Sequence, residues 1–198
     1  MDIKNLLITA VISVFSLTSF AQESKKKIKE VGLTFYNLDN YGLIYKIGKE
    51  DRLWRFSALS GSLSTNAMST ATFTSFGFNF AAGRERRKAI SEKIYFAYGI
   101  ELTCGIAQNI TNTDISKSLT IKENSVSPGL TGILGFHYSP KNNWYIQADL
   151  LPSLRYFRVK TTSTYSGSRP LPTEIEHSSW LNFGLNSNSA MISIGLKF

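Results

Sequence analysis

The chain has 198 residues and a formal net charge of +8 at pH 7, and this length suggests a single domain. Hydrophobic residues make up 42%, aromatic residues 13% and charged residues only 18%, which excludes a disordered chain with few aromatics and a high charge density. One cysteine excludes a disulfide scaffold and a cysteine-rich metal site. Because no apolar run reaches the roughly 18 residues of a membrane-spanning helix, a secreted all-β protein or a membrane β-barrel remains.

Residues 1–21 have the pattern of a cleaved secretory signal peptide. Lys4 is the basic start, the apolar centre follows up to Phe20, and Ala21 ends a small-x-small cleavage motif. We expect cleavage near Ala21, then a basic periplasmic tail over residues 22–30 and one barrel domain over residues 31–198. A buried N-terminal core helix is the alternative for the first segment. Export to a compartment without nucleic acid removes the usual partner of a basic protein.

From residue 31 onward, apolar residues alternate with small, polar or charged ones, as in β-strands with two different faces. The predicted strands span residues 31–37, 40–48, 52–62, 72–83, 93–108, 126–138, 144–159 and 180–198. A soluble β-sandwich also alternates. Here, however, the apolar face has the length of a tilted membrane strand, and the opposite face is small or charged. The sequence therefore predicts an all-β fold, an eight-stranded antiparallel up-and-down transmembrane β-barrel.

Two places leave the strand count open. The segment 31–37 counts as a strand only if Asn37 to Asn40 form a tight turn. The last segment changes phase between Asn186 and Ser189, which indicates either a β-bulge or a further turn. A bulge keeps the count at eight, whereas a further turn there would make nine strands; a barrel of ten strands is also possible. We favour eight because single-chain bacterial barrels normally have an even number of strands.

The predicted connections alternate between short turns, which we place in the periplasm, and long loops, which we place outside. The short turns are Lys49–Asp51, Arg84–Glu92 and Ser139–Asn143, and the long loops are Ser62–Thr70, Ile110–Asn124 and Thr161–Ser178. Aromatic residues beside the short turns are predicted to form an interfacial girdle. They are Tyr45, Trp54, Phe80, Phe96, Tyr138 and Trp144.

The chain ends in Phe198, preceded by the alternating apolar residues Ile192, Ile194 and Leu196. This end resembles the assembly signal of outer-membrane β-barrel proteins, although many of them carry Tyr where Leu196 stands. The whole mature chain resembles the small OmpA/OmpX-like barrels, in particular the Bacteroidota-type outer membrane protein beta-barrel domain family. The resemblance implies the outer membrane of a Gram-negative bacterium, outer-membrane lipid and lipopolysaccharide as surroundings, and insertion by the barrel-assembly machinery. That machinery would read Phe198 and the three apolar residues before it.

The alternation also assigns polar side chains to the inside of the barrel. They are Lys46, Arg55, Asn79, Glu101, Gln147, Asp149 and Arg155. An eight-stranded lumen is just wide enough for side chains to fill it, and buried charges persist when they are paired. We therefore expect Glu101 and Asp149 to meet Arg55, Arg155 or Lys46 in a structural plug. The functional alternative is a gated water path or a proton relay.

His137 and Ser139 are weak catalytic candidates, because a His-x-Ser pair resembles the outer-membrane lipid A deacylases, whose nucleophile needs a neighbouring base. Both residues are predicted to face the lumen, whereas a lipid-cleaving site should open toward the bilayer, so we predict no catalytic residue. Cys104 falls on the apolar face at mid-strand and is interpreted as a small hydrophobic residue without reactivity.

His177 lies beside Glu174 and Glu176 and could join a surface metal site, but a solvated charged loop explains the three residues better. We predict neither a metal nor a cofactor. Two basic clusters, Lys25–Lys29 and Arg84–Lys88, are predicted on the periplasmic side, where they could contact anionic lipid headgroups. Neither cluster has the interleaved aromatics of a nucleic-acid-binding platform.

These features favour a non-enzymatic integral outer-membrane β-barrel with an envelope-structural role or a surface-interaction role through long external loops. Two alternatives stay open. One is an outer-membrane enzyme or narrow conduit on the same barrel, and the other is a secreted lipocalin-like ligand carrier. A fold by itself does not specify a function.

Overall fold

The computed structural model describes residues 27–36, 40–60, 64–68, 71–115, 117–141, 143–166, 173–185 and 189–198. The predicted signal peptide and most of the predicted turn from Asn37 to Asn40 lie outside these residues. Within the described ranges, no helix is long and apolar enough to cross a membrane.

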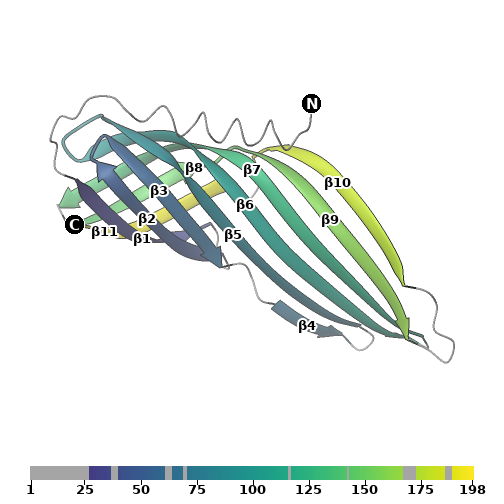
Figure 1. The fold of residues 1–198 in the computed structure, drawn as a ribbon. Coiled ribbons are helices and arrows are strands. Elements are labelled where there is room, and N and C mark those ends of the chain that lie inside the picture. The colour runs from purple at the N-terminus through teal and green to yellow at the C-terminus, as the bar shows by residue number, and fades with distance from the viewer. Residues whose placement is uncertain are drawn as a thin grey trace, which may run out of the picture.

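The described residues form one antiparallel β-sheet that closes on itself (Figure 1). Its strands are β1 (Ile28–Phe35), β2 (Tyr41–Lys49), β3 (Arg52–Ser60), β4 (Ser64–Met68), β5 (Ala71–Ala89), β6 (Ile94–Ile115), β7 (Lys117–Lys141), β8 (Trp144–Leu150), β9 (Ser153–Ser166), β10 (Glu174–Gly184) and β11 (Ala190–Lys197). Eight of them pair in a ring, in the order β1, β2, β3, β5, β6, β7, β8, β11 and back to β1. The predicted eight-stranded antiparallel barrel is therefore confirmed, with β4, β9 and β10 as additions to the ring.

Strand periodicity decides which side chains face inward. Along β6, Ile100 and Leu102 face outward with 57% and 54% of their surface exposed, whereas Glu101 between them is 3% exposed. Successive side chains of a strand point to opposite faces of the sheet, so this contrast repeats around the ring. The barrel is consequently polar inside and apolar outside.

The predicted strand 144–159 is broken into β8 and β9 at Pro152. Proline has no N–H to donate to the sheet, and strands tolerate it only at edges, ends or irregularities. The long strand β7 bridges the break, because its Leu134–Lys141 half pairs with β8 and its Ser118–Thr131 half pairs with β9. Between the two halves, Gly132 N donates a 2.8 Å hydrogen bond to Pro152 O.

The predicted strand 180–198 is likewise divided into two strands. Gly184 at the end of β10 stands opposite Ser153, and Ala190 at the start of β11 stands opposite Leu150. The change of phase at Asn186–Ser189 falls mostly outside the described residues. β11 pairs with β8 and β1 and completes the ring, whereas β10 pairs with β9. The ring count therefore stays at eight.

The strands on one side of the barrel are longer than those on the other side. Figure 1 shows β5, β6, β7, β9 and β10 continuing together past the ends of β1, β2 and β3. The predicted loop Ile110–Asn124 is thus the end of a β6–β7 hairpin, and parts of the other two predicted loops belong to β4, β9 and β10. These segments are rich in Ser, Thr and Asn, so apolar and polar residues do not alternate along them. The backbone hydrogen bonds that define a strand nevertheless continue.

At the opposite end, β5 extends through the predicted turn Arg84–Glu92 as far as Ala89. Glu85 and Arg87 consequently point into the barrel and are buried, while the residues between them point outward. β1 begins at Ile28, before the predicted barrel boundary at residue 31, and this places Glu30 inside the barrel as well.

Candidate functional site

The lumen holds a cluster of buried charged side chains centred on Glu85 of β5. Its Oε2 lies 2.8 Å from Lys46 Nζ of β2 and 3.2 Å from Arg55 Nη1 of β3, and its Oε1 lies 2.7 Å from Arg87 Nε. All four residues are almost entirely inaccessible to solvent. Since β2, β3 and β5 are neighbours in the ring, their inward side chains converge on one point of the narrow interior.

Arg55 extends the cluster across the ring to β6, β8 and β11. Its Nη1 donates to Asp149 Oδ2 of β8 at 2.8 Å, and its Nε lies 3.3 Å from Glu101 Oε2 of β6. Its Nη2 also approaches Met191 Sδ at 3.7 Å. One guanidinium therefore joins three carboxylates from three strands, which is the arrangement that the fixed fork of arginine donors allows.

Arg87 extends the cluster toward the β2–β3 turn. It makes a bidentate pair with Glu30 of β1, with N–O distances of 2.7 and 2.6 Å, and its Nη1 lies 3.2 Å from His137 Nε2. His137 Nδ1 lies 3.1 Å from Gln147 Oε1, which also accepts a 2.5 Å hydrogen bond from Lys46. Paired, hydrogen-bonded charges are the form in which ionised groups persist inside proteins.

Tyr145 closes this end of the lumen. Its ring stacks on His137 with centroids 5.0 Å apart, and Lys46 Nζ lies 5.4 Å from its centroid. The ring fits because Gly32 and Gly195 face it without side chains: a Cβ on Gly195 would lie 2.6 Å from Tyr145 Cε1. The two glycines belong to β1 and β11, the strands that close the ring.

The charged cluster and Tyr145 fill the part of the lumen that they occupy, because their side chains are almost entirely buried. Three cations, Lys46, Arg55 and Arg87, stand against four carboxylates, and a small apolar cluster adjoins them. That cluster contains Ile133, Leu151 and Met191, with Tyr36 packed against it. Chemically, such an interior cross-links the six strands β1, β2, β3, β5, β6 and β8, and its charged groups pair with one another.

The structure brings four of the five residues predicted for the lumen charge network into one cluster, namely Lys46, Arg55, Glu101 and Asp149. Arg155 lies apart, with its Nη1 3.5 Å from Asn79 Oδ1. Sequence reasoning missed Glu30, Glu85 and Arg87. The signal was present, since Glu85 and Arg87 continue the inward phase of Gly83 and Ala81, but the basic run suggested a turn.

The weak catalytic candidates do not form a nucleophile–base pair. Both ring nitrogens of His137 are engaged by Arg87 and Gln147, and Ser139 Oγ lies 3.4 Å from Trp144 O. The predicted loop around His177 is strand β10, so His177 points to the opposite face from Glu174 and Glu176. No group of three potential metal ligands occurs within the described ranges.

The residues of the predicted assembly signal lie on the outside of the closing strand. Ile192, Ile194 and Leu196 each have about half of their surface exposed, while the backbone of β11 pairs with β8 and β1. Phe198 follows β11 and exchanges two backbone hydrogen bonds with Lys29, at 2.8 and 3.1 Å.

Tyr45 is the central residue of β2 (Tyr41–Lys49). Four of the six predicted girdle residues lie close to strand ends on the side of the short turns: Trp54, Phe96, Tyr138 and Trp144. Phe80 does not. Because β5 runs on to Ala89, Phe80 lies at mid-strand, opposite Ala58 and Cys104. It belongs to the apolar wall rather than to a girdle.

These features define the class of the molecule: a closed eight-stranded antiparallel β-barrel with an apolar exterior and an ion-paired interior. No protein-family model matches the chain, and no curated protein matches its sequence. Among solved structures, the chain is similar to a major outer membrane protein from Thermus thermophilus, with a TM-score of 0.46, 9% identity, and coverage of 87% of this chain and 98% of that one. It is also similar to CarO of Acinetobacter baumannii, with a TM-score of 0.36, 11% identity, and coverage of 86% and 96%.

Proposed function

We propose that this protein is a non-enzymatic integral outer-membrane β-barrel that anchors a projecting β-sheet at the surface of a Gram-negative cell. The observation that carries the proposal is the inverted distribution of side chains, with Lys46, Arg55 and Glu85 fully buried and with large exposed apolar residues on every ring strand. A continuous exposed apolar surface is unstable in water and stable in lipid. The resemblance to the OmpA/OmpX-like barrels and to the Bacteroidota-type family supports this placement.

The filled lumen argues against two of the alternatives. A lipocalin-like carrier needs an interior cavity for its ligand, and a conduit needs a continuous water path. Here Arg55, Glu85 and Tyr145 each have 0% of their surface exposed. Arg55 of β3 also reaches across the ring to Asp149 of β8, at 2.8 Å. The barrel therefore acts as an anchor rather than as a container.

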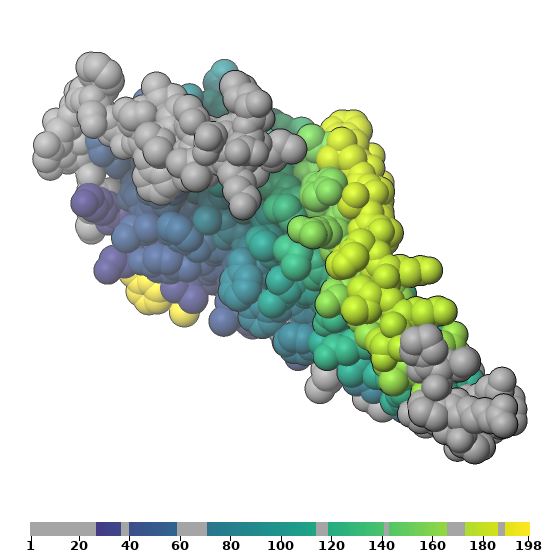
Figure 2. Space-filling view, turned by 45° about the vertical axis from the view of Figure 1, so that its right-hand side comes forward, coloured from purple at the N-terminus to yellow at the C-terminus, as the bar shows by residue number. Residues whose placement is uncertain are grey.

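The parts of β5, β6, β7, β9 and β10 that project beyond β1, β2 and β3 supply the surface for interaction. They are held by cross-strand polar contacts suited to water on both faces, such as Gln108 Nε2 to Asn124 Oδ1 at 2.7 Å and Thr120 Oγ1 to Asn112 Oδ1 at 2.9 Å. Figure 2 shows β10 along one margin of this sheet. All but the last of its residues are exposed on both faces, and β9 is its partner in the described part of the chain.

Membrane insertion is tested on the outer-membrane fraction by comparing boiled and unboiled samples on an SDS gel. We expect the unboiled protein to migrate faster, because a closed antiparallel barrel resists SDS until it is heated. In proteoliposomes, the single Cys104 should resist a membrane-impermeant maleimide and react after denaturation, since it faces outward at mid-strand. A soluble protein with no mobility shift and a reactive Cys104 would contradict the proposal.

The conduit alternative is tested in planar lipid bilayers. We expect purified, heat-shifting protein to show no conductance steps, because the ion-paired cluster fills the lumen. Reproducible steps from protein with an intact mobility shift would show that the cluster opens, and the conduit would then be the better description.

The enzymatic alternative is tested on lipid A. We expect the mass spectrum of lipid A from expressing cells to be the same with the native protein, with Ser139→Ala and without the protein, because His137 is committed to Arg87 and Gln147. Loss of an acyl chain that depends on Ser139 would establish catalysis.

A further inference from the structure

The outer face of β5 carries a row of cations near the end of the barrel that bears the β2–β3 turn. Arg84, Arg86 and Lys88 alternate with the buried residues of the same strand and are all exposed. Arg52 of β3 stands directly opposite Arg86 and adds a fourth outward cation. Three of the four are arginines, the side chain whose planar fork binds phosphate through two donors.

These arginines have little acidic company. The side chain of Arg52 lies 3.8 Å from Asp51 in an exposed pair, and Arg84 lies with its Cζ 5.0 Å from the ring centroid of Trp54. Within the described ranges, no ion pair joins Arg84 or Arg86 to a carboxylate. Their neighbours across the sheet at the level of Arg84 are Trp54 and Ile100, so the charge is set against an apolar wall.

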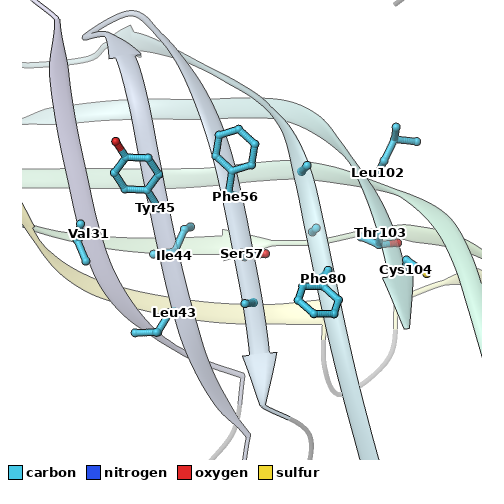
Figure 3. A pocket seen from close by; sticks show the side chains of 13 residues that line it. Val31, Leu43, Ile44, Tyr45, Phe56, Ser57, Phe80, Leu102, Thr103 and Cys104 are labelled. Atoms are coloured by element: carbon cyan, nitrogen blue, oxygen red, sulfur yellow. The ribbon is translucent and has the colours of Figure 1, made fainter. Parts of the chain in front are cut away.

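An apolar groove of about 620 Å³ lies beyond Arg84 on β3, β5 and β6 and extends over β2 to β1 (Figure 3). Its floor is made by small outward residues, Ala58, Ala82 and Cys104. Larger side chains also line the groove, and Figure 3 shows them on neighbouring strands of this wall: Leu43, Tyr45, Phe56, Phe80 and Leu102. Register connects the parts, since Ala82 is two residues from Arg84 and stands opposite both Phe56 and Leu102.

A second hollow of about 430 Å³ contains the arginines themselves. It is lined by Arg84 and Arg86 on one side and by Tyr98, Ile100 and Leu134 on the other. Arg86 and Tyr98 are direct cross-strand neighbours. The outer wall thus has a cationic recess with a phenol at its edge, joined through Arg84 to an acyl-sized groove.

We infer that this composite surface binds one anionic glycerophospholipid of the periplasmic leaflet. The phosphate lies on Arg84 and Arg86, and an acyl chain lies in the groove over Ala82. The inference rests on the proposed function, because it requires the apolar wall to face lipid and the β2–β3 turn to lie at the periplasmic side. It goes further in naming one ligand class and one place on the wall.

Charge and shape make this assignment rather than a general attraction to membranes. A cation that faces hydrocarbon is unfavourable unless it reaches the interface or gains an anion, and a lipid phosphate supplies that anion at the required level. The groove then gives the chains of the same molecule a surface that flat parts of the wall lack. A headgroup that carries a compensating cation, such as phosphocholine, offers the arginines a weaker partner.

The experiment measures lipid retention by native mass spectrometry on detergent-purified, heat-shifting protein. The protein is mixed with equal amounts of dioleoyl-phosphatidylglycerol and dioleoyl-phosphatidylcholine. We expect one phosphatidylglycerol to be retained in preference, and the double variant Arg84→Gln/Arg86→Gln to lose that preference by about tenfold, as for the loss of charge-assisted hydrogen bonds. The control variant Arg158→Gln/Lys160→Gln removes the same charge from exposed positions of β9 and should keep the preference.

A third variant, Ala82→Phe, fills the groove from an outward position and should weaken retention of phosphatidylglycerol while leaving the mobility shift intact. Equal retention of both lipids by the native protein, or an equal loss in the Arg158/Lys160 control, would overturn the inference and leave the membrane placement standing. Absence of a mobility shift in the native protein would instead overturn the proposed function. The two failures are therefore distinguishable.

Discussion

Replacing Arg55 with alanine is expected to lower the free energy of unfolding by about 3–5 kcal/mol, the cost of removing one partner from a buried ion pair. The guanidinium of Arg55 contacts Asp149, Glu85 and Glu101 at 2.8–3.3 Å, and all of these carboxylates lie inside the barrel. Without Arg55, three negative groups from three strands would face one another in a space closed to water. Lys46 and Arg87 would still engage Glu85, so Asp149 and Glu101 bear most of the loss.

The measurement is urea unfolding in lipid vesicles, followed by the loss of the heat-dependent mobility shift. Arg52→Ala is the matched control, because Arg52 is an outward arginine of the same strand whose exposed pair with Asp51 spans 3.8 Å. Exposed pairs of this kind contribute about 0–1 kcal/mol. If Arg55→Ala and Arg52→Ala unfolded at the same urea concentration, the lumen cluster would not be a structural cross-link.

Replacing Gly195 with alanine is expected to prevent the ends of the barrel from closing correctly. The added Cβ would lie 2.6 Å from Tyr145 Cε1 and 2.7 Å from its Cζ, and it would also press on Val31 O in the neighbouring strand. Overpacking typically costs about 1–3 kcal/mol, and here the strain falls on the β1–β11 pairing that completes the ring. A displaced Tyr145 would also leave its stacking contact with His137.

Refolding yield into lipid vesicles, measured as the fraction of unboiled protein that migrates in the fast form, checks this prediction. Gly77→Ala is the control, since a Cβ at Gly77 meets its nearest atoms at 3.6 and 3.7 Å, an ordinary contact. We expect Gly77→Ala to refold as the native chain does, and Gly195→Ala to yield mostly the slow, unfolded form. Equal yields would show that Tyr145 moves aside at little cost and that its packing against Gly32 and Gly195 is not required for the barrel to close.

The variants Arg55→Ala and Gly195→Ala test two different sets of contacts that hold the barrel closed. The ion pairs hold β2, β3, β5, β6 and β8 together through the lumen, whereas the glycines let Tyr145 sit against the pairing of β1 with β11. Both act inside a ring whose outer wall would be stabilised by lipid. The closed eight-stranded ring therefore gives the projecting sheet of β5, β6, β7, β9 and β10 a rigid base.

Much of the barrel could be predicted from the alternation of side chains alone. The period of two assigned Lys46, Arg55, Glu101 and Asp149 to the inner face because strand geometry sends successive side chains to opposite sides, whatever the neighbouring strands are. The same local rule accounts for the exposed Ile192, Ile194 and Leu196. The fold class follows from such local patterns, since the contrast between a polar and an apolar face is repeated along each strand of the closed ring.

The contrast between polar and apolar faces does not encode where the strands end or which charges pair, and these features were decided by the tertiary structure. From Ile110 to Asn124 both faces of the β6–β7 hairpin are largely polar, so the sequence resembles a loop, although the backbone hydrogen bonds continue. Glu85 and Arg87 looked like part of a charged turn because charge alone does not reveal a partner, and their partners Lys46 and Glu30 are distant in sequence. The sequence by itself thus determined the faces of the strands, whereas only the tertiary structure decided where each strand ends and which charges meet, because those depend on contacts between residues far apart in the chain.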